Sequence, residues 1–189
     1  MDWNLFQTVN DWSRQSTWAH GFFRTYADYG IVVFALGLAV AFLIGVRDDA
    51  KIMARTVWTA IAAMIPLVLN QPIANLVDRA RPYTAHHHVL VLVDKGHDPS
   101  FMSDHSLVAG AVAIGLIFAV RKLGYLMLAL AVVMAFTRVY VGAHYPSDVI
   151  AGFVFGGLIA AAGIPLADRY LTPLCVRVRE LPLLARLRR

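Results

Sequence analysis

An arginine, a histidine and an aspartate lie close together in "RVYVGAHYPSD", a segment between two long apolar stretches. Pro146 suits the first turn of a helix, so His144 precedes that turn and Asp148 lies within it. We expect the Asp148 carboxylate to reach one imidazole nitrogen of His144 and to leave the other free. A histidine held in one tautomer by a carboxylate is prepared to act as a nucleophile or a base. Arg138 ends the preceding stretch, where a lone arginine can equally extend to a membrane surface.

Two further arginines follow the second apolar stretch, in "DRARPY". Arg79 and Arg81 are alternate residues, and Pro82 ends any helix that reaches them. Taken alone, the pair can be explained as basic side chains that meet lipid phosphates at the edge of a membrane. The other interpretation is an anion site, since guanidinium groups bind phosphate oxygens through paired hydrogen bonds.

A third polar segment, "DPSFMSDHS", comes directly before another apolar helix. Ser103 is expected to be the N-cap of that helix, which places His105 in its first turn. A helix start has free backbone N–H groups and the positive end of the helix dipole, so it favours an anion. A cap explains Ser103 and can explain Asp104, but it gives no reason for His105.

The composition points to a membrane protein. Of the 189 residues, 59% are hydrophobic and 15% are charged, whereas soluble domains carry about a quarter charged residues. We assign the net charge of +5 to basic loops that face anionic membrane lipids. Nucleic-acid binding is not expected, because no basic patch is interleaved with aromatic residues. Cys175 is the only cysteine, so neither a disulfide framework nor a cysteine metal site is expected.

The apolar stretches predict an all-α integral membrane bundle of about five transmembrane helices. They cover residues 31–46, 56–71, 106–120, 123–137 and 149–167. A span needs about 20 residues, and each stretch can extend through its polar or aromatic flanks. Residues 1–29 predict an amphipathic helix that either lies in the membrane interface or packs against the other helices. We therefore divide the chain into this segment, a membrane domain over 30–168 and a basic tail over 169–189.

Basic residues predict the orientation of the bundle. They gather in the 47–55 connection, at Arg121 and Lys122, and in the tail. With five spans these three groups fall on one side, which should be the cytoplasm. The segments 72–105 and 138–148 then fall together on the opposite side.

The three polar segments therefore meet on one face. Guanidinium groups and two helix N-termini suit a tetrahedral oxyanion such as phosphate. One oriented histidine can attack phosphorus while a second protonates the leaving oxygen. The combination predicts phosphoryl transfer without a metal. A small transporter or a membrane scaffold with a degenerate anion site is the alternative from another class, although no ionisable residue lies in the middle of a span.

These motifs resemble the signature of the type 2 phosphatidic acid phosphatase superfamily, which also includes vanadium haloperoxidases and glucose-6-phosphatase. The signature contains a lysine ahead of Arg-Pro, a Pro-Ser-Gly-His block, and Ser-Arg-x5-His-x3-Asp. The chain matches it with "RP" at Arg81–Pro82, "MSDH" at Met102–His105 and "TRVYVGAHYPSD" at Thr137–Asp148. The resemblance covers roughly residues 70–160.

The resemblance implies a role for each matching residue. His144 would be the nucleophile that forms a phosphohistidine, Asp148 would orient it, and His105 would protonate the leaving group. The phosphate oxygens would be held by Arg81, Arg138 and Ser103. No metal or other cofactor is implied.

The chain departs from the signature at three positions. The motif lysine falls on Ala74, so one phosphate contact is missing or is supplied by Arg79. Met102 and Asp104 replace the proline and the glycine, and Asp104 could face away, bind a substrate hydroxyl or tune His105. "SFMSDH" and the opening "LFQTVNDW" look like the bacterial bacitracin-resistance branch, whose members dephosphorylate undecaprenyl pyrophosphate. Phosphatidic acid, phosphatidylglycerol phosphate and other prenyl-linked phosphates stay open as substrates.

Three consecutive histidines, His86 to His88, invite a metal-site interpretation. Consecutive side chains point in different directions, and no second ligand cluster with metal spacing is present. We therefore expect a flexible outer loop at these residues and no metal.

Overall fold

The computed structural model describes residues 1–185, which form helices and loops and, within that range, no strand. In chain order the elements are α1 (Asp2–Gln15), the 3-10 turn η1 (Thr17–Ala19), α2 (His20–Tyr29), α3 (Ile31–Arg47), α4 (Ala50–Val77), α5 (Pro82–Ala85), α6 (Asp104–Ala119), α7 (Arg121–Tyr140), α8 (Pro146–Ala162), α9 (Ile164–Leu166), the π-helical turn η2 (Ala167–Leu171), α10 (Thr172–Arg179) and α11 (Pro182–Ala185). The predicted all-α bundle is confirmed.

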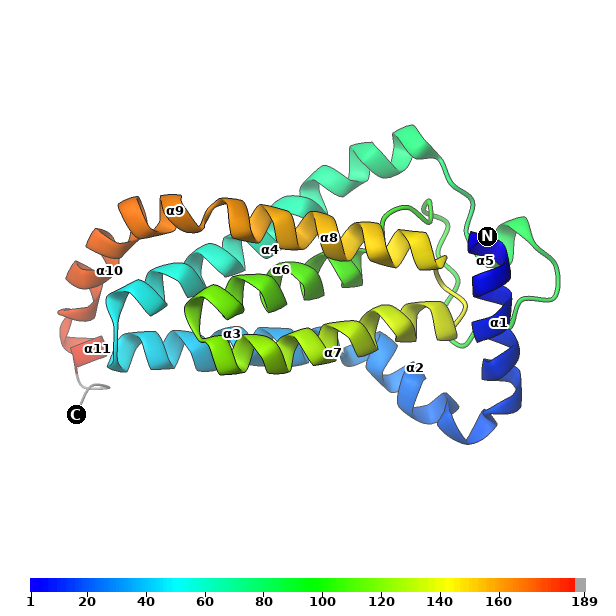
Figure 1. The fold of residues 1–189 in the computed structure, drawn as a ribbon, viewed down its shortest axis with the longest axis horizontal. Helices are drawn as coiled ribbons and strands as arrows, with labels where there is room; N and C mark the ends of the chain where they lie inside the picture. Colours follow the sequence, from blue (N-terminus) through cyan, green and yellow to red (C-terminus); the bar gives the residue numbers. More distant parts are fainter. Residues whose placement is uncertain (186–189) are drawn as a thin grey trace.

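α6 lies at the centre of the bundle and contacts α3, α4, α7 and α8 (Figure 1). Gly156 lets α8 approach α6 closely, because a Cβ at this position would overlap the backbone oxygen of Leu107. Lipid tails are as apolar as the side chains, so helices in a membrane associate mainly through close packing of small residues. The glycine therefore sets the distance between the two helices whose first turns carry the predicted site.

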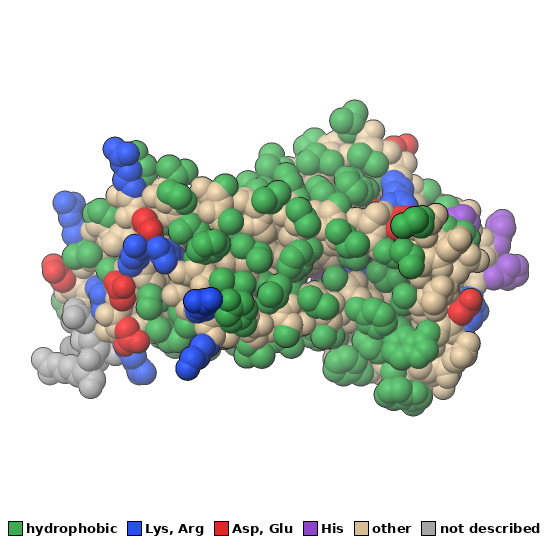
Figure 2. Space-filling model, viewed as in Figure 1, with side chains coloured by type: hydrophobic (Ala, Val, Ile, Leu, Met, Phe, Trp, Pro, Cys, Tyr) green, Lys and Arg blue, Asp and Glu red, His purple; other side chains and the backbone are tan. Residues whose placement is uncertain are grey.

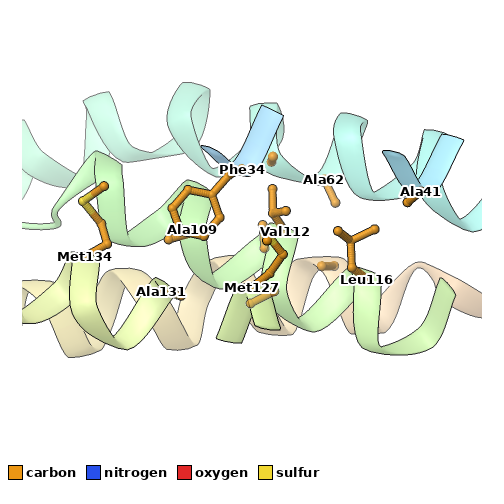
Figure 3. Close-up of a cluster of buried hydrophobic side chains, with 13 residues drawn as sticks. Phe34, Ala41, Ala62, Ala109, Val112, Leu116, Met127, Ala131 and Met134 are labelled. Atoms are coloured by element: carbon orange, nitrogen blue, oxygen red, sulfur yellow. The ribbon is translucent and has the colours of Figure 1, made fainter. Parts of the chain in front are cut away.

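A cluster of buried apolar side chains surrounds α6 (Figure 3). Its large members are Phe34 of α3, Val112 and Leu116 of α6, and Met127 and Met134 of α7. The other buried members are alanines, which add little side-chain volume between the helices. Few large side chains and many small ones thus fill the space between tightly packed backbones.

Three segments are long and apolar enough to cross a membrane, namely Ala50–Ala85, Arg121–Tyr140 and Pro146–Arg179. α3 meets this criterion together with Thr17–Tyr29, from which it is separated by a bend of 55°. α6 has 16 residues, or roughly 24 Å of helix, which is less than the ~30 Å of a bilayer core. The five expected apolar stretches form α3, α4, α6, α7 and α8 in order, but α6 does not meet the length criterion, so among the described residues up to four spans meet it. α6 can be shorter because neighbouring helices enclose it.

The N-terminal helices cover one end of the bundle, where α1 runs across the ends of the other helices (Figure 1). α1 packs on α7 and α8, and it buries Phe6, Asn10 and Ser13. The Asn10 side chain binds both backbone groups of Leu90, at 2.8 Å and 3.0 Å. These contacts favour the interpretation of residues 1–29 as a segment packed on the bundle. The single helix expected there is instead divided into α1, η1 and α2. The boundaries after residues 29 and 168 stay predictions.

Many basic residues gather at the end of the bundle away from α1 (Figure 2). Asp168 accepts hydrogen bonds from Nε and Nη2 of Arg55 at 2.8 Å and 2.7 Å, and it lies 3.3 Å from Nζ of Lys51. Arg55 also donates to the backbone oxygen of Phe118 at 2.7 Å. In the tail, Nε of Arg179 donates to the backbone oxygen of Val46 at 2.9 Å. The described residues of the three basic groups therefore share one end of the molecule. The tail residues Arg186, Arg188 and Arg189 lie outside the described residues.

Gly156→Ala is expected to destabilise the protein by about 1–3 kcal/mol, the usual range for overpacking, because the new methyl group meets backbone that cannot rotate away. The midpoint of thermal unfolding in detergent should fall. Gly21→Ala in α2 is the matched control, since no described atom lies within 4 Å of a Cβ there. Its midpoint should stay unchanged or rise with the better helix propensity of alanine. Equal midpoints for the two variants would contradict the close approach of α8 to α6.

Candidate active site

A cavity of about 210 Å³ lies where the three polar segments meet. The end of α4, the first turn of α6, the end of α7 and the loops before α6 and α8 contribute to its wall. It is lined by Asn70, Gln71, Ala74, Arg81, Asp98, Pro99, Met102, Asp104, His105, Arg138 and His144. Most residues predicted for the site thus line one space, while Ser103, Arg79 and Asp148 are outside this lining.

His144 is buried, and its two ring nitrogens have different surroundings. Nδ1 lies 2.8 Å from the backbone oxygen of Ser100, and Nε2 lies 3.2 Å from Nη1 of Arg81. A carbonyl oxygen only accepts and a guanidinium only donates, so the proton is on Nδ1 and the lone pair is on Nε2. Nε2 is therefore the nitrogen that can attack a substrate in the cavity.

Burial lowers the pKa of His144 well below its usual range, and the positive charges of Arg138 and Arg81 lower that pKa further. The imidazole is consequently neutral at pH 7, which is the form that a nucleophile or a base requires. The folded chain binds this proton less readily than the unfolded chain. The contribution of neutral His144 to folding stability is therefore complete above about pH 6.5 and is lost as the pH falls below it.

The expected hydrogen bond between Asp148 and His144 is not formed. Oδ2 of Asp148 is 4.0 Å from Nδ1, and it accepts instead from the Ser100 hydroxyl at 2.5 Å and the Tyr145 backbone N–H at 3.0 Å. Asp148 occupies the third position of α8, so its carboxylate turns back onto the backbone N–H of the N-cap residue, Tyr145. The hydrogen-bonded connection from Asp148 to the imidazole thus passes through Ser100.

Arg81 lines the cavity, and both sides of its guanidinium are engaged. Nη1 donates to the backbone oxygen of Ala143 at 3.2 Å. Nε donates to the backbone oxygen of Asp98 at 3.0 Å, and Nη2 donates to the Asp98 carboxylate at 2.6 Å. The Asp98 side chain is 56% exposed, so water and salt weaken this ion pair. A carboxylate thus occupies a position that a substrate phosphate would need.

Arg138 is buried at the end of α7, with a relative exposure of 8%. The alternative of an arginine that extends to the membrane surface is therefore wrong. Nη1 makes one long contact, 3.4 Å, to the backbone oxygen of Ala27. Within residues 1–185, Nε has no hydrogen-bond partner. A buried N–H without an acceptor costs free energy, and an anion bound in the cavity would supply the missing acceptor.

The start of α6 contributes a serine and a histidine. Ser103 is the N-cap residue, as predicted, although its side chain makes no capping bond among the described residues. Its hydroxyl oxygen lies 3.3 Å from the Ser106 hydroxyl, which donates to it. The proton of Ser103 is then available for another acceptor. His105 lines the cavity together with His144, so two imidazoles share one space.

Asn70 is a site residue that the sequence analysis missed. Its side chain binds the backbone oxygen and N–H of Met102 at 2.9 Å and 3.1 Å, and it donates to Oδ1 of Asp104 at 2.7 Å. Asp104 therefore lines the cavity and does not face away. Ala74 lies one turn further along α4 and presents only a methyl group where the motif lysine would stand. The available signal was an asparagine near the end of the mostly apolar stretch 56–71.

Arg79 does not supply the missing phosphate contact. Nη1 binds Asp148 and the Ser147 hydroxyl, both at 2.7 Å, and Nη2 binds Asp2 at 2.5 Å. Arg79 turns to Asp148 because this carboxylate is buried, and a carboxylate removed from water needs a cationic partner. Arg79 is that partner, so its guanidinium is directed away from the cavity.

The three consecutive histidines are not among the residues that line the cavity. His86 stacks on Trp3 with ring centroids 3.5 Å apart, and the backbone oxygen of His88 accepts a hydrogen bond from Arg14. Part of the loop that we expected to be flexible is thus packed on α1. Among residues 1–185, no group of three or more His, Cys, Asp and Glu side chains is placed to hold a metal ion.

Comparison with known proteins identifies the family. The sequence model of the PAP2 superfamily matches residues 53–170, which are more than half of the chain. The chain belongs to the PAP2 superfamily. Its signature motifs meet at the cavity, with Arg81 from the first, His105 from the second, and Arg138 and His144 from the third.

Individual PAP2 relatives cover different parts of the chain. It is 29% identical to Undecaprenyl-diphosphatase BcrC of Bacillus subtilis over 182 residues, which are 95% of this chain and 92% of that protein. It is 38% identical to Lipid A 1-phosphatase of Rhizobium etli over 110 residues, or 53% of this chain and 47% of that protein. The crystal structure of a transmembrane PAP2 type phosphatidylglycerolphosphate phosphatase from Bacillus subtilis aligns with a TM-score of 0.62. That alignment has 17% sequence identity over 88% of this chain and 86% of the other, and it shows a shared fold.

Asp98→Asn is expected to strengthen competitive inhibition by inorganic phosphate about two- to fivefold. The bound anion would no longer have to displace a carboxylate from Arg81, and exposed ion pairs are worth roughly 0.2–1 kcal/mol. The measurement is the inhibition constant of phosphate at constant ionic strength. Asp94→Asn, which changes an exposed carboxylate of the same loop, is the control and should leave the constant unchanged. An unchanged or weaker inhibition in Asp98→Asn would show that Asp98 does not compete for Arg81.

Proposed function

We propose that the protein is an integral membrane phosphatase that hydrolyses a polyprenyl pyrophosphate, undecaprenyl pyrophosphate in particular, through a phosphohistidine. One observation carries this proposal: the neutral His144 directs the lone pair of Nε2 towards Arg81 in a cavity that Arg138 also lines. The similarity to a protein named Undecaprenyl-diphosphatase BcrC over nearly the whole chain supports the substrate and the bacitracin-resistance branch.

In the first step, Nε2 of His144 attacks the terminal phosphorus, and the bond from this phosphorus to the bridging oxygen breaks. The imidazolium form of His105 donates its proton to that oxygen, so a polyprenyl monophosphate leaves and His105 becomes neutral. Arg81 exchanges its contacts with Nε2 and Asp98 for contacts with phosphate oxygens, and Arg138 donates its unpaired N–H. The Ser103 hydroxyl is buried behind the cavity lining, and its free proton would make it a third donor if the bound phosphoryl group reaches it.

In the second step, a water molecule attacks the phosphohistidine while His105 accepts its proton. The bond between phosphorus and Nε2 breaks, inorganic phosphate leaves, and His144 returns to its neutral form. The phosphorylated ring carries additional positive charge as long as Nδ1 keeps its proton. The backbone oxygen of Ser100 accepts this N–H at 2.8 Å, so it stabilises the charged intermediate without having to move.

A lipid substrate suits the surroundings of the cavity. One face of α4 contributes Asn70 and Ala74 to the lining, while Val68 and Leu76 of the same helix are exposed. Exposed apolar side chains of a membrane helix contact lipid tails. The polyprenyl chain can therefore lie along α4 while its diphosphate enters the cavity from the side.

We assign the active site to the outer face of the bacterial plasma membrane. The cavity is at the α1 end of the bundle, and the three basic groups share the other end. Basic residues are enriched on the cytoplasmic side of membrane proteins. A cavity at the opposite end would therefore open to the periplasm or the exterior.

Phosphate release from a panel of lipid phosphates, with EDTA present, tests the function. Wild-type protein should prefer undecaprenyl pyrophosphate, and His144→Ala should lower kcat at least a hundredfold because the nucleophile is removed. His87→Ala, which changes an exposed loop histidine, is the control. If kcat/KM were tenfold higher for phosphatidic acid or phosphatidylglycerol phosphate, a difference of about 1.4 kcal/mol, undecaprenyl pyrophosphate would be rejected as the substrate. Turnover of His144→Ala within about tenfold of wild type would eliminate the covalent mechanism.

His105→Ala should distinguish good leaving groups from poor ones. A polyprenyl phosphate leaves more easily when its oxygen is protonated, whereas an activated aryl oxygen leaves without help. We therefore expect kcat to fall at least tenfold more for the lipid diphosphate than for an activated aryl phosphate. Equal losses on the two substrates would contradict a role of His105 as the general acid.

A further inference from the structure

The carboxylate of Asp2, at the start of α1, binds the start of α8. It accepts hydrogen bonds from the backbone N–H of Ser147 at 3.0 Å, from the Ser147 hydroxyl at 2.6 Å and from Nη2 of Arg79 at 2.5 Å. Ser147 is the second residue of α8, and its N–H has no partner within that helix. An acidic residue from a distant part of the chain thus caps the helix that follows the proposed nucleophile.

Arg79 connects Asp2 to Asp148. Its Nη1 lies 2.7 Å from Oδ1 of Asp148, and its guanidinium lies over the Tyr145 ring at 3.9 Å. Asp148 is fully buried, and Arg79 is its ion-pair partner. A planar guanidinium can bind two carboxylates at fixed positions, which a lysine cannot do with the same geometry.

The contacts continue from Asp148 to the imidazole through Ser100. The Ser100 hydroxyl donates to Asp148 at 2.5 Å, and its backbone N–H donates to the backbone oxygen of Arg79 at 2.7 Å. Its backbone oxygen accepts from Nδ1 of His144 at 2.8 Å. Three hydrogen bonds thus fix Ser100, and the direction of Nε2 depends on this residue.

We propose that Asp2 and Arg79 are positioning residues for His144, so that α1 is part of the catalytic apparatus. The inference rests on the proposed function, because it assigns to these residues the orientation of the proposed nucleophile. Burial raises the pKa of Asp2, but hydrogen bonds from Ser147 and Arg79 outweigh this and hold its pKa below the usual value. Asp2 is then ionised at neutral pH and can hold Arg79 by charge as well as by hydrogen bonding.

Asp2→Asn is the first test, with the lipid diphosphate as substrate. Arg79 and the Ser147 backbone N–H bind different oxygens of Asp2, so the asparagine amide would place a donor against one of them and would also remove the negative charge. We expect kcat to fall at least fivefold and KM to stay within twofold, because Arg81 and Arg138 are unchanged. Asp11→Asn is the matched control, since Asp11 is an exposed carboxylate of the same helix paired with Arg14, and it should retain the wild-type kcat.

Arg79→Lys provides a second variant that keeps the positive charge beside Asp148 but loses the planar fork. It should lower kcat with little change in KM, and adding Asp2→Asn to it should cause less than a twofold further loss. A kcat of Asp2→Asn within twofold of wild type would overturn the inference. The inference would also be overturned if the factors by which the two substitutions lower kcat simply multiplied in the double variant. The same holds if KM rose by the same factor by which kcat fell. Wild-type protein without activity on any lipid phosphate would defeat the proposed function instead.

Discussion

The hydrogen bond from Nδ1 of His144 to the backbone oxygen of Ser100 is the interaction on which the site depends. It keeps the proton on Nδ1 and leaves the lone pair of Nε2 for the cavity. It also gives the ring a fixed acceptor for the charge that phosphorylation would add. The groups that hold Ser100, namely the Asp148 carboxylate and the Arg79 backbone oxygen, are therefore proposed to orient the imidazole, although neither hydrogen-bonds to it.

Charge in the cavity is balanced in a way that favours binding of an anion. Burial, and after it the charges of Arg138 and Arg81, lower the pKa of His144 and keep it neutral, so the proposed nucleophile and the proposed phosphate-binding groups depend on each other. Arg138 has a buried N–H without an acceptor, whereas Arg81 already binds the Asp98 carboxylate. A substrate phosphate would satisfy the first arginine and compete with Asp98 for the second.

The bundle brings these groups together because its central helix is nearly surrounded by others. Small residues on α6 and α8 allow their backbones to approach, and both helices begin beside the cavity. α6 therefore directs the positive end of its dipole towards the site. α1 lies across the helix ends and contributes Asp2 to the network around α8. The shape of the cavity consequently depends on packing along the bundle and on a helix outside it.

Local spacing and the composition of continuous segments were enough to predict the five apolar helices of the bundle, the N-cap at Ser103 and the residues of the three motifs. It also predicted that His105, Arg81, Arg138 and His144 meet. The hydrogen-bond partners of the site residues, in contrast, depend on the tertiary structure. Asp148 binds Ser100 instead of the imidazole, and Arg79 binds carboxylates instead of substrate. Asn70 clamps Met102 from 32 positions away, and Asp2 reaches Ser147 across 145 positions. Hydrogen bonds between such distant residues depend on how the helices pack, which no local pattern records.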